Sequence, residues 1–499
     1  MQVCWFKRDL RIQDHAPLLQ SLQDAPANGP VLPMYIHEPS WWAQPDTAGQ
    51  HLGFARECLS ELAAGIKGAG GTLFMPIGEA VDILEALWRR YPLSRLVSYQ
   101  ETNNRYTFER DLTVKAWCRA RGVEWVELPQ NGVSRGAQFK ANGFKFGQHL
   151  EALLREPQAL PANPLWAAAP TVTKTLPAIT GDKPARQRGG RSQAVQYLNA
   201  FLSPDKLFAY PKAISSPNTA VEGCSRLSPY LAFGVISDGE IFRALNQQRD
   251  ALRPALNPNQ AAVLDNALNF FVERLYWRAA YLQSFELDYT REHENELSQF
   301  NDQREGVFVP EWLEAWKTGR TGVPYVDAAM RMLATTGWLN MRLRGTVTSF
   351  AVNELWLPWQ MVGLHLAREF LDYEASIHWS QLQIHAGTAR GWDPLTYNPR
   401  KQARDHDPSG RFVKQWVPEL RNVPLENLVE PWTMSPPMQA AASCYIGSDY
   451  PAPLLNLQQA HDAAKERVAA LRKGLTPPPN RFWLTRDEQR TALVQGGLF

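Results

Sequence analysis

Hydroxyl side chains, an arginine and a proline come together in Gly223–Gly234, in the order in which a helix begins. Ser225 and Ser228 can accept hydrogen bonds from backbone N–H groups, and Pro229 suits the first turn of a helix. The free N–H groups of such a turn attract anions, and Arg226 adds a fixed positive charge. The pattern is typical of an ordinary capped helix, and it also meets the needs of a diphosphate-binding turn.

Two further segments place charges within otherwise apolar helical sequence. Arg342 and Arg344 occur in one of them, and Asp372 and Glu374 occur in the other. A buried arginine needs a partner because an unpaired buried charge is costly, and these carboxylates are the nearest candidates in a helical bundle. The pattern predicts either a structural ion pair or a charged functional site.

The aromatic content and one polar segment add to the candidate list. The chain has 18 Trp against 9 Met. Packing in a large helical core explains that excess, and a stacking surface for a cofactor or a base is the alternative. The turn-rich segment Tyr397–Leu420 contains Arg400, Lys401 and Arg404 and, taken alone, predicts a loop.

Composition bounds the kind of protein that carries these residues. At roughly 150 residues per domain, 499 residues predict two to four domains, and 44% hydrophobic residues suffice for a buried core. No run of about 18 apolar residues predicts a membrane span, and the charged N-terminus argues against a signal peptide. A formal net charge of +2 does not by itself indicate a nucleic-acid partner. We expect no metal site, no disulfide framework and a reduced, cytoplasmic protein, because the cysteines are scattered without a CxxC pair: Cys4, Cys58, Cys118, Cys224 and Cys444.

The elements expected in residues 1–131 alternate between short apolar runs and amphipathic stretches. Helical spacing in 51–67 and 81–90 separates the runs, which predicts βαβ units and a doubly wound parallel sheet. The segment after the first run lacks the glycine fingerprint of an ordinary dinucleotide site. The predicted strands are Val3–Phe6, Val31–Ile36, Thr72–Met75, Leu96–Tyr99 and Glu124–Leu128.

The composition changes after this region. Residues 157–190 are rich in Pro, Ala, Thr and Gly, which predicts a connector along the surface. Its basic end, with Lys183, Arg186, Arg188 and Arg191, is typical of a solvated face, and phosphate contact is the alternative. The chain then has apolar stripes at helical spacing, which predict an all-α region with helices over 194–201, 236–249, 261–282, 324–335, 339–357, 364–371 and 457–471.

Six segments occur in the order and spacing of the photolyase/cryptochrome family, which the chain resembles from Met1 to about Pro431. The resemblance implies an α/β antenna domain over 1–131, a connector over 132–191, an all-α FAD-binding domain over 192–435 and a helical extension over 436–499. The segments are WFKRDLR, GCSRLSPYLAFG, KTGRTGVPYVDAAMRML, TGWLNMRLR, LDYE and YNP…HDPSGRFVKQWVPEL.

The resemblance also implies an activity. Members that are enzymes use excited, reduced FAD to pass an electron to a UV-induced pyrimidine dimer flipped out of DNA, and the dimer splits. We therefore expect a blue-light-driven deoxyribodipyrimidine photo-lyase, and the alternative is a cryptochrome-type photoreceptor that signals through the redox state of its flavin. The expected partner is UV-damaged DNA, double- or single-stranded, and we expect a monomer without membrane contact. A second, antenna chromophore of folate or flavin type is left open.

Flavin contacts carry over residue by residue from the family pattern. Arg278 resembles an arginine near the FAD phosphates, and Arg344 with Asp372 resembles the ion pair beside the isoalloxazine. Glu374 stands where Asp is usual, and His378 where Asn usually faces the reactive ring nitrogen; a histidine in that position can titrate near neutral pH and could make flavin reduction pH-dependent. The implied cofactor contacts are Tyr210, Cys224 (in place of Thr), Ser225, Arg226, Leu227, Ser228, Arg278, Arg344, Asp372, Tyr373, Glu374 and His378.

The implied lesion contacts depart from the family pattern. Trp277 matches a tryptophan that packs on the flipped base. Arg274 replaces a glutamate that hydrogen-bonds the dimer, and Glu273 lies about 100° away around the helix. Leu339–Met341 replaces Met-His-Asn, so the type of dimer is left open. The implied DNA and lesion contacts are Glu273, Arg274, Trp277, Asn340, Met341, Arg342, Arg400 and Lys401.

The tryptophan chain that photoreduces the flavin in this family is incomplete here. Trp359 matches its middle member, but Leu382 occupies the inner position. Trp379 is a candidate relay, as are Trp338, Trp356 and Trp392, and core packing is the alternative for each. The catalytic candidates are Trp277, His378, Trp359 and Trp379.

Overall fold

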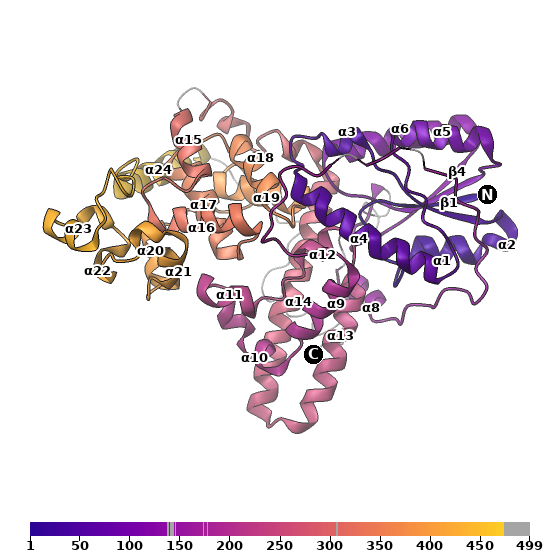
Figure 1. Ribbon diagram of the computed structural model, residues 1–499, viewed down its shortest axis with the longest axis horizontal. Helices are drawn as coiled ribbons and strands as arrows, with labels where there is room; N and C mark the ends of the chain where they lie inside the picture. Colours follow the sequence, from indigo (N-terminus) through magenta and orange to yellow (C-terminus); the bar gives the residue numbers. More distant parts are fainter. Residues whose placement is uncertain are drawn as a thin grey trace.

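The N-terminal part of the chain is a parallel sheet with helices on both faces (Figure 1). The computed structural model describes residues 1–136, 139, 144, 146–172, 174–176, 178–305 and 308–473. Four strands lie in the order β2-β1-β3-β4, and every neighbouring pair is parallel. The expected doubly wound sheet is therefore confirmed. Its strands are β1 (Gln2–Phe6), β2 (Val31–Tyr35), β3 (Arg95–Tyr99) and β4 (Glu124–Leu128), and its helices are α1 (Ala16–Gln23), α2 (Ala25–Asn28), α3 (Pro39–Trp42), α4 (Gly49–Gly68), α5 (Ala80–Arg90) and α6 (Arg105–Arg121).

The strand expected at 72–75 does not form. Phe74 makes only an isolated bridge with Met34, through hydrogen bonds of 2.9 Å to Pro33 and from Tyr35. A second isolated bridge joins His37 to Ile77, with hydrogen bonds of 2.8 Å from His37 to Pro76 and 3.1 Å from Gly78 to His37, so the pairing resumes past Pro76 without forming a continuous ladder.

The connector lies against the edge of the sheet, where Trp166 bridges to Val31. Its basic end was expected to be a solvated face, with phosphate contact as the alternative; Arg188 is exposed, whereas Lys183, Arg186 and Arg191 are largely withdrawn from solvent. All four cations are ion-paired, because acidic groups on α4, on the connector itself and on the helical part lie opposite them. Arg186 is 6% exposed. The pairs are Lys183 with Glu369, Arg186 with Asp182 and Glu57, Arg188 with Glu57, and Arg191 with Glu240.

The rest of the described chain is helical (Figure 1), as the apolar stripes predict. The expected helix over 339–357 is an α-helix that ends at Ser349 and continues as a π-helical turn, Phe350–Glu354. The helices are α8 (Phe146–Leu153), α9 (Arg191–Phe201), α10 (Pro204–Ala213), α11 (Pro217–Gly223), α12 (Ser228–Ala232), α13 (Asp238–Leu252), α14 (Pro258–Leu287), α15 (Pro310–Lys317), α16 (Pro324–Thr336), α17 (Met341–Ser349), α18 (Trp359–Glu369), α19 (Ala375–Ala386), α20 (Pro399–His406), α21 (Arg411–Trp416), α22 (Leu425–Leu428), α23 (Pro436–Ala442) and α24 (Leu457–Arg472).

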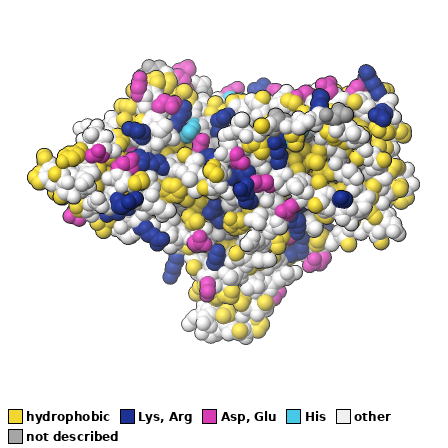
Figure 2. All heavy atoms as spheres, in the orientation of Figure 1, with side chains coloured by type: hydrophobic (Ala, Val, Ile, Leu, Met, Phe, Trp, Pro, Cys, Tyr) yellow, Lys and Arg dark blue, Asp and Glu magenta, His cyan; other side chains and the backbone are white. Residues whose placement is uncertain are grey.

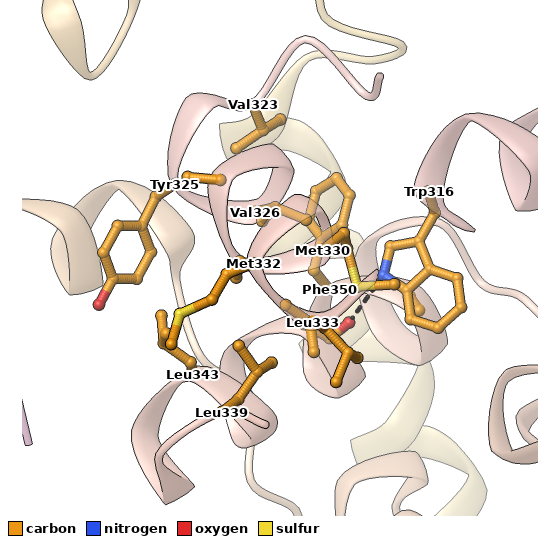
Figure 3. Close-up of a cluster of buried hydrophobic side chains, with 14 of the residues drawn as sticks. Trp316, Val323, Tyr325, Val326, Met330, Met332, Leu333, Leu339, Leu343 and Phe350 are labelled. Atoms are coloured by element: carbon orange, nitrogen blue, oxygen red, sulfur yellow. Dashed lines mark hydrogen bonds between the residues drawn. The ribbon is translucent and has the colours of Figure 1, made fainter. Parts of the chain in front are cut away.

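The helical part has its own hydrophobic core. Figure 3 shows Trp316, Met330, Leu333 and Phe350 pointing toward one another between α15, α16 and α17, and each is buried. The indole N–H of Trp316 donates to the carbonyl of Val347 at 3.1 Å, so its polar atom is satisfied. This core fixes α16 and α17 in place.

The loop after β1 joins the sheet to the helical part. Arg8 donates to the carbonyls of Ala232 and Tyr373, both at 2.9 Å, and Leu10 donates to Phe233 at 3.1 Å. The end of α12 and the segment before α19 are therefore held against the carboxyl end of the sheet. The predicted domain boundaries stay a prediction, and residues 474–499 of the predicted C-terminal extension lie outside the described residues.

Two findings concern the described residues as a whole. None of the helices in that part of the chain is both long enough and apolar enough to cross a membrane. Across the same residues, no group of three or more His, Cys, Asp or Glu side chains is arranged to hold a metal ion.

Candidate functional site

The turn before α12 offers unused hydrogen-bond donors. Among the described residues, the backbone N–H groups of Ser225, Arg226 and Ser228 donate to no partner. Arg226 has a φ of 56°, a left-handed conformation that is uncommon outside glycine. Its guanidinium donates to Gln187 at 2.8 Å and lies 4.0 Å above the ring of Trp338, so it braces the turn. The turn can therefore bind an anion through its backbone.

The expected ion pair between Arg344 and Asp372 is present. The guanidinium donates to both carboxylate oxygens, at 2.9 and 2.7 Å, and to the carbonyl of Leu339 at 2.9 Å. It also lies 4.1 Å over the ring of Phe370. The Asp372 side chain is 4% exposed, so the pair is well screened from water.

The turn and this ion pair share one electrostatic environment. Burial raises the pKa of the Cys224 thiol to about 11, and the positive charges of Arg226 and Arg344 act in the opposite direction. Burial is also the main cause of the raised pKa of Tyr210, with a smaller contribution from Cys224. A bound anion would lie among positive charges here.

Arg278 and Glu374, both expected to contact the cofactor, form an ion pair. They pair with each other at 2.7 Å, and Arg278 also lies 3.4 Å from Asp238 and donates to Asn131 at 3.3 Å. Arg278 is 8% exposed, and a buried guanidinium is stabilised only with its partners close by. The charge of Arg278 is therefore balanced by Glu374 and Asp238 within the protein.

His378 differs from the expectation that it titrates near neutral pH. Burial lowers its pKa to about 4, and the nearby charge of Arg344 lowers it further, although a hydrogen bond to Gly363 favours the charged form. Its Nε2 lies 2.9 Å from the carbonyl oxygen of Gly363. The imidazole is therefore neutral at physiological pH.

Aromatic rings continue from His378 in an unbroken series. Its ring centroid lies 4.9 Å from that of Trp379, and Trp379 lies 5.9 Å from Trp359. The inner position of the usual chain holds Leu382, which is buried. A β-carbon at Gly363 would come within 2.2 Å of Trp379, so the bare glycine makes room for this indole.

Tyr373 contacts the same series. Its ring centroid is 5.2 Å from that of His378, and its hydroxyl accepts the N–H of Trp379 at 3.1 Å. The hydroxyl donates to Asp46 of the N-terminal part at 2.7 Å. Sequence reasoning missed Asp46 and Gly363, since nothing in the local sequence indicates that either one reaches α19.

The lesion candidates on α14 lie close to one another. The Trp277 ring centroid is 5.9 Å from that of Trp392 and 6.3 Å from that of Tyr281. Its indole N–H donates to Glu273 at 3.2 Å, and Glu273 also pairs with Arg274 at 2.8 Å. Glu273 therefore joins Trp277 to Arg274, the residue that replaces the family's glutamate.

The remaining candidates are divided between structural and exposed positions. Asn340 is 3% exposed; it caps α17, and its amide donates to Ile214 at 2.7 Å, which differs from the expected lesion contact. Its side-chain oxygen accepts the N–H of Leu343, because the first turn of a helix needs a side-chain acceptor. Met341 is 52% exposed, and Arg342 lies 5.4 Å over Tyr397. Arg400 pairs with Glu430 at 3.1 Å, and Lys401 is exposed.

The residues fit a bound FAD. Besides the free N–H groups of the turn, the hydroxyls of Ser376 and Ser380 are buried and have no hydrogen-bond partner. They lie one turn apart on α19, which packs against α14 and α17. Unsatisfied buried hydroxyls are uncommon and call for a polar partner.

A parallel sheet joined to a helical body with an anion-binding turn, a buried arginine–aspartate pair and an aromatic series defines a two-part flavoprotein architecture. The family model for the FAD binding domain of DNA photolyase matches residues 271–470, and the DNA photolyase model matches residues 2–162. The chain belongs to the photolyase/cryptochrome family, and its cofactor is FAD.

Proteins named photolyase and proteins named cryptochrome are both similar to the chain. Cryptochrome DASH of Gloeobacter violaceus is 27% identical over 93% of this chain and 94% of its own. The deoxyribodipyrimidine photo-lyase of Escherichia coli is 27% identical over 94% of this chain and 98% of its own. The crystal structure of a bacterial class III photolyase from Agrobacterium tumefaciens has a TM-score of 0.78 at 24% identity, covering 95% of this chain and 98% of that one.

Proposed function

We propose that this protein splits UV-induced pyrimidine dimers in DNA under blue light, as a deoxyribodipyrimidine photo-lyase. The observation that carries the proposal is the contact of Trp277 with Trp392, whose centroids are 5.9 Å apart. Both indoles are only partly buried, so they can present apolar faces to an extruded base. Stacking on indole suits any base, and a base lacking stable pairing is the least costly to flip out.

The residues around the cofactor have defined tasks. The turn at Ser225–Ser228 binds the diphosphate, and the Arg344 guanidinium favours negative charge on a nearby ring system. The imidazole of His378 is neutral, so it can take part in a hydrogen bond with the cofactor without adding a charge. Bound FAD supplies the electron that splits the dimer.

Exposed Lys and Arg side chains would contact the DNA backbone. Figure 2 shows Lys and Arg side chains across the middle of one face, interspersed with Asp and Glu. Lys401 is exposed, and Arg342 is partly exposed beside Tyr397. Because such contacts release counterions from DNA, binding should weaken as salt is raised.

A photoreceptor role is the second candidate, and one observation favours it. Glu273 and Arg274 pair with each other, and Asn340 is used as a helix cap, so the positions that would hydrogen-bond a dimer are engaged within the protein. A protein that only senses light would show a light-dependent change in association and no dimer loss.

A repair assay on defined oligonucleotides tests the proposal. Protein with chemically reduced flavin is mixed with DNA carrying one cyclobutane dimer or one (6-4) photoproduct and exposed to blue light. We expect the wild type to remove one of the two lesions and Trp277→Ala to lose most of that activity. Trp88→Ala is the matched control, since Trp88 is 38% exposed on α5 of the N-terminal part. Persistence of both lesions with the wild type contradicts the proposal.

A further inference from the structure

Tyr373 lies between an indole and a carboxylate. Its hydroxyl oxygen accepts the N–H of Trp379 at 3.1 Å, and its O–H donates to Oδ2 of Asp46 at 2.7 Å. The exposed fractions of Tyr373, Trp379 and Asp46 are 5%, 1% and 2%. A hydrogen-bonded series therefore runs from indole through phenol to carboxylate, shielded from water.

The carboxylate is held in place and can accept a proton. Asn104 donates to Oδ2 of Asp46 at 2.9 Å and fixes its orientation. Oδ1 of Asp46 is buried and has no hydrogen-bond partner. The carboxylate therefore has an unused acceptor oxygen beside the one to which the Tyr373 phenol donates.

The next tryptophan in the series, Trp359, has no such base as the partner of its indole N–H. Trp359 lies 5.9 Å from Trp379 by ring centroids, and its indole N–H donates to the amide oxygen of Asn295 at 2.7 Å. An amide oxygen does not take up a proton near neutral pH, so an oxidised Trp359 keeps its positive charge. Charge buried in this apolar helical core is costly, as Trp359 is 1% exposed.

The phenol of Tyr373 cannot ionise in advance. Burial raises its pKa well above the ordinary value, and the neighbouring Asp46 and Glu292 raise it further. Tyr373 is therefore neutral at rest, and an electron can leave it readily only when the proton leaves as well.

We infer that Tyr373 is a light-driven electron donor to Trp379 and that Asp46 receives its proton. The inference rests on the flavin of the proposed function, because photoexcited, oxidised flavin is the one-electron oxidant of Trp379. One electron passes from the Tyr373 phenol to the oxidised indole, the O–H bond breaks, and the proton moves to Oδ2 of Asp46. Trp379 regains its neutral state with its N–H intact. Tyr373 becomes a neutral phenoxyl radical and Asp46 a neutral acid.

Flash photolysis of the oxidised holoprotein tests this directly. Transient absorption and electron paramagnetic resonance, with ring-deuterated tyrosine to assign the signal, identify the radical that remains. We expect a tyrosyl radical in the wild type and a tryptophan radical in its place in Tyr373→Phe. Asp46→Asn should lower the tyrosyl yield, since an amide cannot accept the proton, and Trp379→Phe should remove the signal.

Tyr450 provides a matched control. It is fully buried in the core of the helical part and donates to Oδ2 of Asp327 at 2.5 Å, but among the described residues it belongs to no stacked or edge-to-face ring pair and no indole N–H donates to it. Tyr450→Phe should therefore keep the tyrosyl signal, which shows that a carboxylate partner alone is insufficient. Flavin absorbance and circular dichroism confirm that each variant is folded and loaded.

Two results overturn the inference: a tyrosyl signal that survives in Tyr373→Phe, or a wild type that yields only tryptophan radicals. Failure of the proposed function gives a different result, since the repair assay uses flavin reduced chemically in the dark and does not need this path. Dimer repair without a tyrosyl radical contradicts the inference alone.

Discussion

His378 shows how one buried side chain can lose the property its type suggests. A histidine opposite the flavin could switch charge near neutral pH, but burial lowers its pKa to about 4. The facing charged groups are Arg344 and Asp372, and Nε2 interacts with the carbonyl of Gly363. The side chain therefore acts as a neutral hydrogen-bonding group.

The first prediction follows from this neutral state. The rate of flavin photoreduction should be the same function of pH in His378→Asn as in the wild type between about pH 6 and pH 8, because a group with a pKa of about 4 is uncharged throughout. The rate is measured by illuminating each protein at a series of pH values and recording the flavin absorbance over time. A step near pH 6.5 in the wild type that disappears in His378→Asn would show a titrating histidine.

At the scale of elements, the contact of α18 with α19 places the aromatic series. Gly363 of α18 lies against Trp379 and Leu382, where an added β-carbon would come within 2.2 and 2.7 Å. Trp379 can therefore occupy the space beside Trp359 only while residue 363 has no side chain.

Gly363→Ala should destabilise the protein. Alanine favours a helix by about 1 kcal/mol over glycine, but overpacking in a core costs about 1 to 3 kcal/mol and displaces the indole. Denaturant unfolding should show a net loss of stability, and the near-ultraviolet circular dichroism of the tryptophans should change. Gly68→Ala is the control, since an added β-carbon there meets nothing within 4 Å. Equal stability of the two variants would contradict the packing account.

At the scale of the whole molecule, buried acids couple the two parts of the chain. Burial raises the pKa of Glu292, in the helical part, to about 7, against the ordinary 4.5, with Asp46 and Glu109 adding to the shift and Arg105 opposing it. Its carboxylate accepts the backbone N–H of Arg105, at the start of α6, at 2.7 Å. The folded protein therefore binds this proton more tightly than the unfolded chain.

The contribution of Glu292 to the free energy of unfolding should accordingly fall as pH rises. A raised pKa contributes stability that is complete below about pH 4.5 and is lost as pH rises through about 7. Between about pH 5 and pH 8, Glu292 should account for about 2 to 3 kcal/mol of this loss. The free energy of unfolding is measured with denaturant at pH 5 and pH 8. The loss that Glu292 contributes in the wild type should be absent in Glu292→Gln. An identical pH dependence in both proteins would mean that Glu292 is ionised in the folded state.

Sequence reasoning predicted the parts of the fold that local patterns determine. Alternating apolar runs predicted β1, β2, β3 and β4, and helical periodicity predicted α14 and α16. The predicted strand at 72–75 does not form because its pairing with β2 and the residues after it is limited to isolated bridges, and such pairing depends on neighbours far along the chain. The ion pairs at the basic end of the connector could not be predicted for the same reason, since Glu57 and Glu369 are remote in sequence.

The contacts of the candidate site could likewise be predicted only in part. The Arg344–Asp372 contact could be predicted because both residues belong to family motifs. Tyr373 and Asp46 are 327 positions apart, and no motif relates them, so only the folded chain reveals their contact. The lowered pKa of His378 likewise depends on packing, which a sequence does not record.

The measurement that tests the central claim most directly is the action spectrum of dimer loss. Holoprotein with its flavin reduced in the dark is mixed with dimer-bearing DNA, and lesions lost per photon are counted at successive wavelengths. The account predicts no loss in the dark and an efficiency that follows the absorbance of the bound, reduced flavin. Lesion counts that stay constant at every wavelength, with DNA bound and flavin reduced, would contradict it.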